Sequence, residues 1–186
     1  MSCSSSSRTV RRRLCLALAA WPLAGVPLAR AQARPDAQSP AQALAGLRRW
    51  GSGEFRRFGF LIYEATLWAA QTGLLRPPLA LALTYRRAIA GQDIAQASVE
   101  QMRRFNGDEA QLARWGEQLT RVFPDVEPGD RILGLQLPDR ARFFHNDRAL
   151  GEVEGAAFGA SFFAIWLDER TSAPALRAAL LRPPGG

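Results

Sequence analysis

Adjacent arginines beside strand-like apolar segments are the residues of this sequence best suited to chemistry. Arg56 and Arg57 precede the longest such segment, and Arg86 follows Tyr85 at the end of another. A guanidinium in an apolar cleft can bind a carboxylate or stabilise a developing oxyanion. The alternative is that these arginines are solvated and cover apolar surface with their stems. The residues alone leave both interpretations open.

The elements around these arginines indicate a turn that leads into a long strand. The segment 51–69 reads GSGEFRRFGFLIYEATLWA, and 58–68 contains a single charged residue, Glu64. Continuous apolar runs are typical of strands buried on both faces, so we expect this strand at the centre of a sheet. Gly51 and Gly53 would give the backbone the freedom to let an anion approach.

Other kinds of catalytic site find little support. His145 is the only histidine, it has no serine nearby, and its surroundings predict an exposed hairpin turn. The acidic cluster of Asp125, Glu127 and Asp130 lies in a proline-containing turn, where capping carboxylates are common. We therefore expect no metal and no cofactor.

The first 33 residues predict a cleaved signal peptide. Arg11–Arg13 precede an apolar run, 14–29, that ends at small residues suited to cleavage. The run is short for a membrane span and contains Pro22 and Pro27, and a transit peptide would be amphipathic instead. The pair Arg12–Arg13 also fits a twin-arginine export signal. The sequence thus predicts a periplasmic or secreted protein without a stable membrane span.

Removing this segment changes the charge of the chain. Five of the 24 arginines and both cysteines precede position 34, whereas all 17 acidic residues follow it. The remainder carries a net charge of +2 instead of the +7 of the whole chain, which does not favour nucleic-acid binding. The absence of thiols from the remainder excludes thiol catalysis and cysteine metal sites.

The rest of the chain predicts a linker, 34–43, and one folded domain, 44–182. Apolar periodicity predicts three strands, two helices, three more strands and two final helices. We therefore expect an α+β protein whose helices pack on an antiparallel sheet. The expected strands are 47–55, 58–70, 79–87, 132–137, 140–144 and 148–153, and the expected helices are 92–105, 109–123, 158–166 and 174–181.

The order and spacing of several segments resemble those of a known family. The segments GSGEFRRFGFLIYEATLWA, LTYRRAIAGQDIA, FPDVEPGDR, FFHNDRALGEVEG and FGASFFAIWLDERTSAPALRAALL together resemble the chalcone isomerase-like proteins, in particular their bacterial exported branch. The resemblance covers about residues 47–181. It implies an open-faced β-sandwich, in which helices cover one side of a large antiparallel sheet and a ligand cleft lies between them.

The resemblance also implies which residues would meet a ligand. The family includes chalcone isomerases, which close a 2′-hydroxychalcone to a flavanone, and non-catalytic relatives that bind fatty acids. In both, an arginine after a Gly-x-Gly turn meets a negative oxygen; here Arg56 lies one place later, so either it takes this role or the role is vacant. The enzymes' threonine falls near Phe58 or Gly59, their tyrosine at Ile94 and their asparagine near Gln101, and Thr171 matches a later polar group.

The altered polar positions favour binding over catalysis. Loss of one positioned oxyanion donor typically costs about 3 kcal/mol, which is a hundredfold or more in rate. The leading hypothesis is an exported protein that binds an amphipathic acid or phenol in an apolar cleft. Its candidate ligand-binding residues are Arg56, Arg57, Arg86 and Thr171.

Two alternatives remain. The first is an intramolecular lyase that acts on a chalcone-like substrate, with Arg56 as the electrophile and with either Tyr63 or Tyr85 as a substitute for the missing tyrosine. The second is an interaction or assembly protein whose cleft is filled by its own side chains. Stereoselective turnover would distinguish the first, and a closed pocket would distinguish the second.

Overall fold

The computed structural model describes residues 39–71 and 75–182. The expected signal peptide, 1–33, and the first half of the expected linker lie outside the described residues. Helix α1 (Pro40–Ala43) falls inside that linker, and the Ser39 side chain accepts a hydrogen bond from the Gln42 amide at 3.3 Å. Part of the expected linker is therefore helical.

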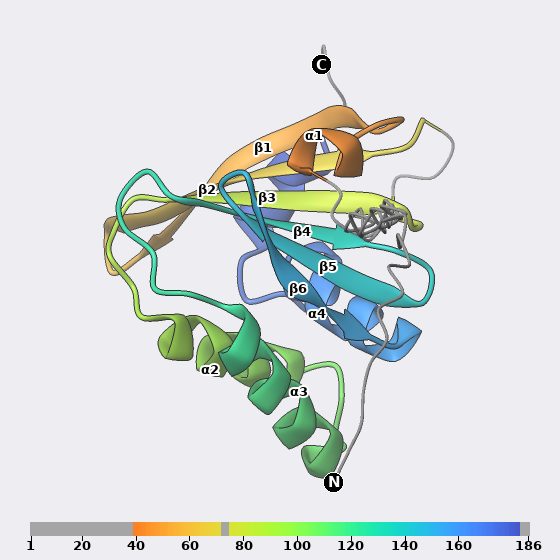
Figure 1. Ribbon diagram of the computed structural model, residues 1–186. Helices are drawn as coiled ribbons and strands as arrows, with labels where there is room; N and C mark the ends of the chain where they lie inside the picture. Colours follow the sequence, from red (N-terminus) through yellow and green to blue (C-terminus); the bar gives the residue numbers. More distant parts are fainter. Residues whose placement is uncertain (1–38, 72–74, 183–186) are drawn as a thin grey trace, which may run out of the picture. The chain divides into compact units, whose positions relative to one another are not determined.

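Six antiparallel strands form one sheet, and each pairs with the next strand along the chain (Figure 1). Helices α2 and α3 are inserted between the third and fourth strands, and α4 and α5 follow the sixth. This arrangement confirms the predicted α+β class and open-faced sandwich. The strands are β1 (Arg48–Arg57), β2 (Phe60–Ala69), β3 (Leu79–Tyr85), β4 (Arg131–Gln136), β5 (Arg140–His145) and β6 (Arg148–Glu154). The helices are α2 (Gly91–Met102), α3 (Glu109–Val122), α4 (Ala156–Leu167) and α5 (Pro174–Leu180).

Strand β3 separates two apolar clusters, because alternate side chains of a strand point to opposite faces of the sheet. Leu81 and Leu83 belong to the larger cluster, which includes the buried side chains of helices α2 to α5. Ala80 and Ala82 belong to a smaller cluster on the other face, which includes Ala43 of α1. Helices α2 to α5 thus cover one face of the sheet.

The strand that we expected at the centre of the sheet, β2, lies near one edge instead. Strand β2 lies second in the order β1 to β6, and it is β3 whose side chains are almost all buried. Phe58 and Gly59, both with positive φ, form the turn between β1 and β2, so the start of the apolar run is a turn. Phe58 and Phe60 are 87% and 59% exposed, which an apolar run in sequence does not reveal.

The two glycines of β1 also have a different role from the one predicted. A methyl group on Gly51 would overlap the carbonyl oxygen of Leu180, and one on Gly53 would come within 2.7 Å of the Ala179 methyl group. Both glycines therefore let helix α5 pack against β1, so the group that approaches the backbone here is the helix and not an anion.

Among residues 39–71 and 75–182, no helix is long and apolar enough to cross a membrane.

Candidate ligand-binding site

An apolar cavity of about 340 Å³ lies between the sheet and helices α2 and α4. Its inner wall is made of buried side chains from the sheet, such as Leu83, Ile132 and Phe143, and from α4, such as Phe162 and Ile165. The volume falls within the range of small-molecule sites, which are mostly apolar with a few polar groups. The cavity is thus suited to the apolar part of a ligand.

The mouth of the cavity is marked by the lining residues that remain exposed to solvent. Arg57 contributes from the end of β1, Asp93 and Ala97 from α2, and Ser172 from the loop between α4 and α5. The Ser172 hydroxyl donates a hydrogen bond to the Gln101 side-chain oxygen at 2.6 Å, which ties this loop to α2. Arg57 is the one arginine among these lining residues, so the cationic group stands at the mouth and the apolar surface lies inside.

An aromatic row crosses the first three strands and forms one wall of the cavity. The rings of Phe55 and Tyr63 are stacked with their centroids 4.9 Å apart, and Tyr63 meets Tyr85 edge-on at 5.9 Å. The indole nitrogen of Trp166, on α4, donates a hydrogen bond to the Tyr63 hydroxyl oxygen at 3.0 Å. The wall therefore combines flat apolar surface with two phenol groups.

Both tyrosines are held in the neutral form. Burial raises the pKa of Tyr63 to about 12, although the hydrogen bond from Trp166 acts in the opposite direction. Burial also raises the pKa of Tyr85, and the neighbouring Tyr63 adds to the increase. Within the described part of the chain, neither hydroxyl donates to a protein acceptor. Both phenols are therefore available as hydrogen-bond donors and are poor general bases at neutral pH.

The structure brings three of the six candidate residues together at the cavity. Arg57, Tyr63 and Tyr85 line it, whereas Arg56 and Arg86 do not. Arg56 forms an ion pair with Glu54 at 2.8 Å, and Arg86 forms one with Glu64 at 2.7 Å. Adjacent residues of a strand point to opposite faces, so Arg57 faces the cavity while Arg56 and its partner Glu54 face away from it.

Thr171 does not line the cavity but holds the loop beside it. It is buried, its hydroxyl donates to the Ile165 carbonyl oxygen at 2.6 Å, and it accepts a hydrogen bond from the Ala173 amide at 3.1 Å. These bonds fix the loop that leads from α4 to α5. Thr171 thereby positions Ser172 and Ala173, which do line the cavity.

Some lining residues were not among the candidates. Trp166 was predicted only as an apolar position of a helix, and Asp93 only as part of a helix start; neither carries a sequence signal for a ligand. The positions matched to the enzymes' tyrosine and asparagine, Ile94 and Gln101, do line the cavity. An apolar side chain thus stands at the first of these two positions.

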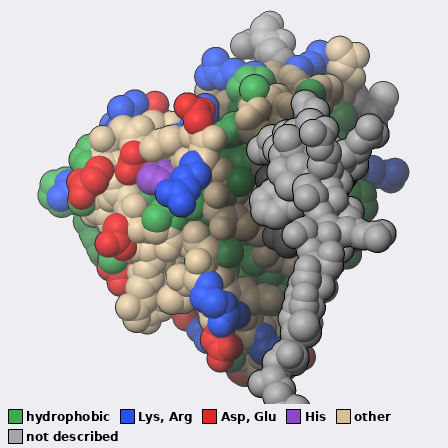
Figure 2. All heavy atoms as spheres, in the orientation of Figure 1, with side chains coloured by type: hydrophobic (Ala, Val, Ile, Leu, Met, Phe, Trp, Pro, Cys, Tyr) green, Lys and Arg blue, Asp and Glu red, His purple; other side chains and the backbone are tan. Residues whose placement is uncertain are grey.

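His145 is not the exposed turn residue that we expected. It ends β5, its side chain is 23% exposed (purple in Figure 2), and its Nε2 atom lies 3.2 Å from an oxygen of the Asp130 carboxylate. Asp130 also accepts hydrogen bonds from Asn146 and from the Glu127 amide, and these bonds lower the pKa of its carboxyl group.

Two carboxylates of the acidic cluster, those of Asp125 and Asp130, accept hydrogen bonds from backbone amides. Asp130 accepts from the Glu127 amide at 2.8 Å, and Asp125 accepts from the Gly91 amide at 2.8 Å. The second bond satisfies an amide at the start of α2, the helix that lines the cavity. In the described ranges, no group of three or more His, Cys, Asp or Glu side chains is placed to hold a metal ion.

These features define an open-faced β-sandwich protein with an internal apolar cavity. The chain belongs to the chalcone isomerase-like family, because residues 51–182 match the sequence model of that family. It is 28% identical over 134 residues to an uncharacterized protein of Haemophilus influenzae; the match covers 70% of this chain and 66% of that protein. The chain therefore spans just under two thirds of the length of that relative.

The fold is also similar to a solved structure from a plant. The crystal structure of a fatty-acid binding protein of Arabidopsis thaliana superposes with a TM-score of 0.56 and 12% sequence identity. The similarity covers 73% of this chain and 87% of the plant protein. At this level of identity it establishes a common fold.

Proposed function

We propose that this protein binds an amphipathic small molecule, such as a fatty acid or a phenol, with its apolar part in the cavity and its acidic group at Arg57. The observation that carries this proposal is the layout of one cavity: buried aliphatic and aromatic walls inside, and a guanidinium at the mouth. Charge-assisted hydrogen bonds from arginine suit a carboxylate or phenolate. The Arabidopsis fold neighbour, a fatty-acid binding protein, supports the same class of ligand.

The protonation of the two cavity tyrosines favours binding of a ligand without reaction. A general base needs a pKa near the working pH, and burial moves the pKa of both cavity tyrosines away from it. An interaction protein with a filled cleft is disfavoured, because the described side chains leave about 340 Å³ open to solvent through the mouth.

The lyase alternative has one observation in its favour. Tyr63, Tyr85 and Arg57 line the same cavity, and neutral phenols with a guanidinium can stabilise a developing oxyanion. Uncatalysed closure of 2′-hydroxychalcone yields a racemic flavanone, so the enantiomeric excess of the product tests this alternative directly. An excess that disappears in Arg57→Ala would replace the binding proposal by a catalytic one.

Export is part of the proposal. It is supported by the basic, then apolar, then small-residue order of the first 33 residues. Mass spectrometry of the protein recovered from its host would test it. A chain that still begins at Met1 and remains in the cytoplasm would contradict it.

Blocking the mouth of the cavity is expected to weaken ligand binding strongly. Ala97 is exposed at the mouth, so Ala97→Trp places an indole there without disturbing the core. The measurement is an equilibrium titration with a fluorescent fatty acid, in which we expect affinity to fall by more than about tenfold. The matched control is Gln96→Trp, on the same helix and exposed but outside this cavity, which should bind as wild type does. Equal affinity in both variants would place the ligand elsewhere.

The two adjacent arginines should differ in their effect on affinity. Arg57→Ala is expected to weaken fatty-acid binding by about tenfold, within the range of a hydrogen bond to a charged group after screening at an exposed mouth. Arg56→Ala should leave the affinity within about twofold, because its partner is Glu54. A fatty alcohol, which lacks the carboxylate, should bind both variants equally. Equal losses in both variants with the acid would mean that Arg57 has no special role.

A further inference from the structure

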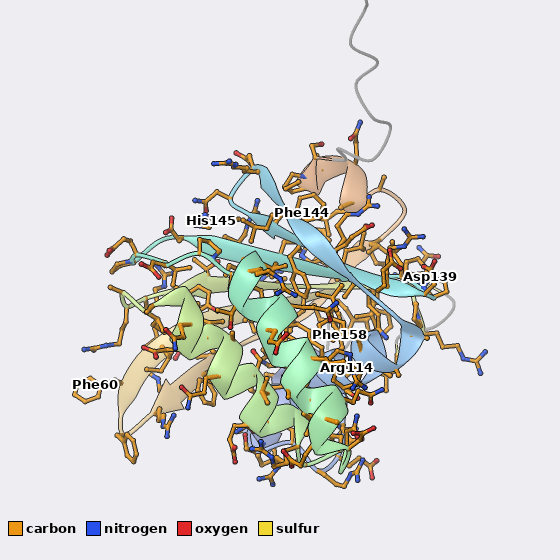
Figure 3. All side chains as sticks on the ribbon, turned by 60° about the horizontal axis from the view of Figure 1, so that its bottom comes forward. Phe60, Arg114, Asp139, Phe144, His145 and Phe158 are labelled. Atoms are coloured by element: carbon orange, nitrogen blue, oxygen red, sulfur yellow. The ribbon has the colours of Figure 1, made fainter. Side chains whose placement is uncertain are left out.

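The turn between β1 and β2 exposes aromatic side chains at one end of the sheet. Phe58 and Phe60 are two of the three large apolar side chains that are mostly exposed within the described ranges; the third, Leu75, lies at the opposite end of β2. Figure 3 shows Phe60 projecting away from the sheet beyond the end of the hairpin. Neighbouring exposed apolar side chains that are rimmed by polar groups can mark a protein or membrane contact site.

Arginines surround this turn. The Arg57 guanidinium lies 5.3 Å from the centre of the Phe58 ring, and the Arg87 guanidinium lies 4.9 Å from the centre of the Phe60 ring. Arg56 and Arg86 are also close, but each is neutralised by a glutamate, as described above. Within the described part of the chain, Arg57 and Arg87 pair with no carboxylate, so the turn carries two uncompensated positive charges. In Figure 2, hydrophobic and arginine side chains adjoin at the left edge, where Figure 1 places this turn.

The turn adjoins the mouth of the cavity. Arg57 both lines the cavity and contacts Phe58, and it pairs with Phe60 across the hairpin. A surface that meets the turn would therefore also meet the mouth. This continuity distinguishes the turn from Leu75, which is exposed but lies beyond the other end of β2 and is adjacent to no residue that lines the cavity.

We propose that the β1–β2 turn docks on the surface of an anionic lipid bilayer, so that an amphipathic ligand passes between the bilayer and the cavity. Phe58 and Phe60 enter the interface between headgroups and acyl chains, where aromatic rings are favoured. Arg57 and Arg87 contact phosphate groups, and each basic residue near such a surface adds to the attraction. The transfer step rests on the proposed function, whereas docking itself does not.

A bilayer fits this turn better than a protein partner does. The exposed surface is a narrow turn with two rings and two free cations, whereas a stable protein interface buries a broad patch with about 20–30 residues on each side. A bilayer needs no shape complementarity to insert two rings, and it supplies many phosphates to a pair of guanidinium groups.

The experiment measures amide hydrogen exchange of the full chain at the turn, 57–61, with and without vesicles. One set contains phosphatidylglycerol and phosphatidylcholine in equal parts, and the other contains phosphatidylcholine alone. We expect slower exchange at the turn on the anionic vesicles and no change on the neutral ones. Since exchange is read at the turn itself, attachment of residues 1–33 to vesicles does not mimic this result.

The variants keep the backbone of the turn. Phe58→Asn tolerates positive φ, and Phe60→Thr suits a strand, so the double variant should fold and lose the protection. Leu75→Asn, the matched control, should keep the protection. No protection on anionic vesicles, or equal protection on both kinds, would overturn the proposal. Protection that appears without lipid as protein concentration rises would assign the turn to a protein contact and also overturn it.

A second readout separates docking from the proposed function. The double variant should bind fluorescent fatty acid in solution as tightly as wild type, because Phe58 and Phe60 do not line the cavity. It should take up the same fatty acid from anionic vesicles more slowly, and a rate equal to that of wild type would overturn the transfer step. A wild-type turn protected by vesicles in a protein that binds no fatty acid would refute the proposed function and leave docking intact.

Discussion

Alkaline titration of the folded protein is expected to show no tyrosinate absorbance near pH 10, the usual pKa of a tyrosine. Tyr63 and Tyr85 are the only tyrosines of the chain, so this absorbance reports on the cavity wall alone. Burial raises the pKa of Tyr63 to about 12 and raises that of Tyr85 as well. The signal should therefore appear only near pH 12 and above, or when the protein unfolds.

The same shift makes stability depend on pH in a defined direction. Between pH 10 and 12 the unfolded chain releases the Tyr63 proton and the folded chain keeps it, so the unfolded state is favoured as pH rises. A shift of two pKa units corresponds to about 3 kcal/mol, which is fully present below pH 10 and lost as pH rises through 12. The chain contains no lysine, so no lysine side chain contributes to this loss.

The measurement is denaturant unfolding at pH 8 to 12, followed together with tyrosinate absorbance. Tyr63→Phe should reduce the fall in unfolding free energy above pH 10 and leave the part due to Tyr85, whereas Tyr85→Phe should leave the part due to Tyr63. Arginine stays protonated throughout this pH range, so it does not contribute to the change in unfolding free energy. Ionisation of the native protein near pH 10 would show that the tyrosines are solvated and that the cavity wall is wet.

The layout of strands and helices could be predicted because apolar periodicity depends on local sequence. Each of the six strands and of the helices α2 to α5 was expected within a few residues of its observed bounds. Strand position was less predictable: the run 58–68 seemed central, but its first residues form a turn whose aromatic side chains are exposed. Which strand is central depends on pairing with β4, more than forty residues downstream of β3.

The candidate site was harder to predict because it depends on which of two adjacent side chains points to the cavity face of the sheet. Arg56 and Arg57 are chemically identical neighbours, and a shift of one place along a strand moves a side chain to the other face. The ladder between β1 and β2 also shifts register between Phe55 and Arg56, so counting from the glycines does not determine which arginine faces the cavity. The resemblance left the role either to Arg56, one place after the family's spacing, or vacant, and the arginine that lines the cavity is Arg57.

The cavity itself has no signature in sequence. Phe162 and Ile165 form part of an ordinary apolar helix stripe, and nothing in their spacing distinguishes a filled core from a hollow one. Whether a space stays open depends on how far the helices stand from the sheet. Helix α5 packs on β1, and the hydrogen-bonded loop before it lines the mouth, so the contact at Gly51 bears on both fold and site.

Gly51→Ala is expected to destabilise the protein by about 3 kcal/mol or more, at the upper end of the effect of inserting one carbon into a packed region. The added methyl group would overlap the Leu180 carbonyl oxygen and lie 2.6 Å from that of Ala179. These are backbone atoms of a helix, so relief requires α5 to move rather than one side chain to rotate. Denaturant unfolding measures the loss in unfolding free energy.

The consequence for the site makes this prediction more specific than a loss of stability. Moving α5 disturbs the loop that Thr171 holds and that presents Ser172 at the mouth, so fatty-acid affinity should fall even under conditions where the variant is fully folded. The matched control is Gly107→Ala, where an added methyl group meets no atom within 4 Å, and both stability and affinity should stay close to wild type. A Gly51→Ala variant as stable as wild type would show that β1 and α5 are not in the contact described. Unchanged fatty-acid affinity in that variant would show that the loop after α4 does not depend on this contact.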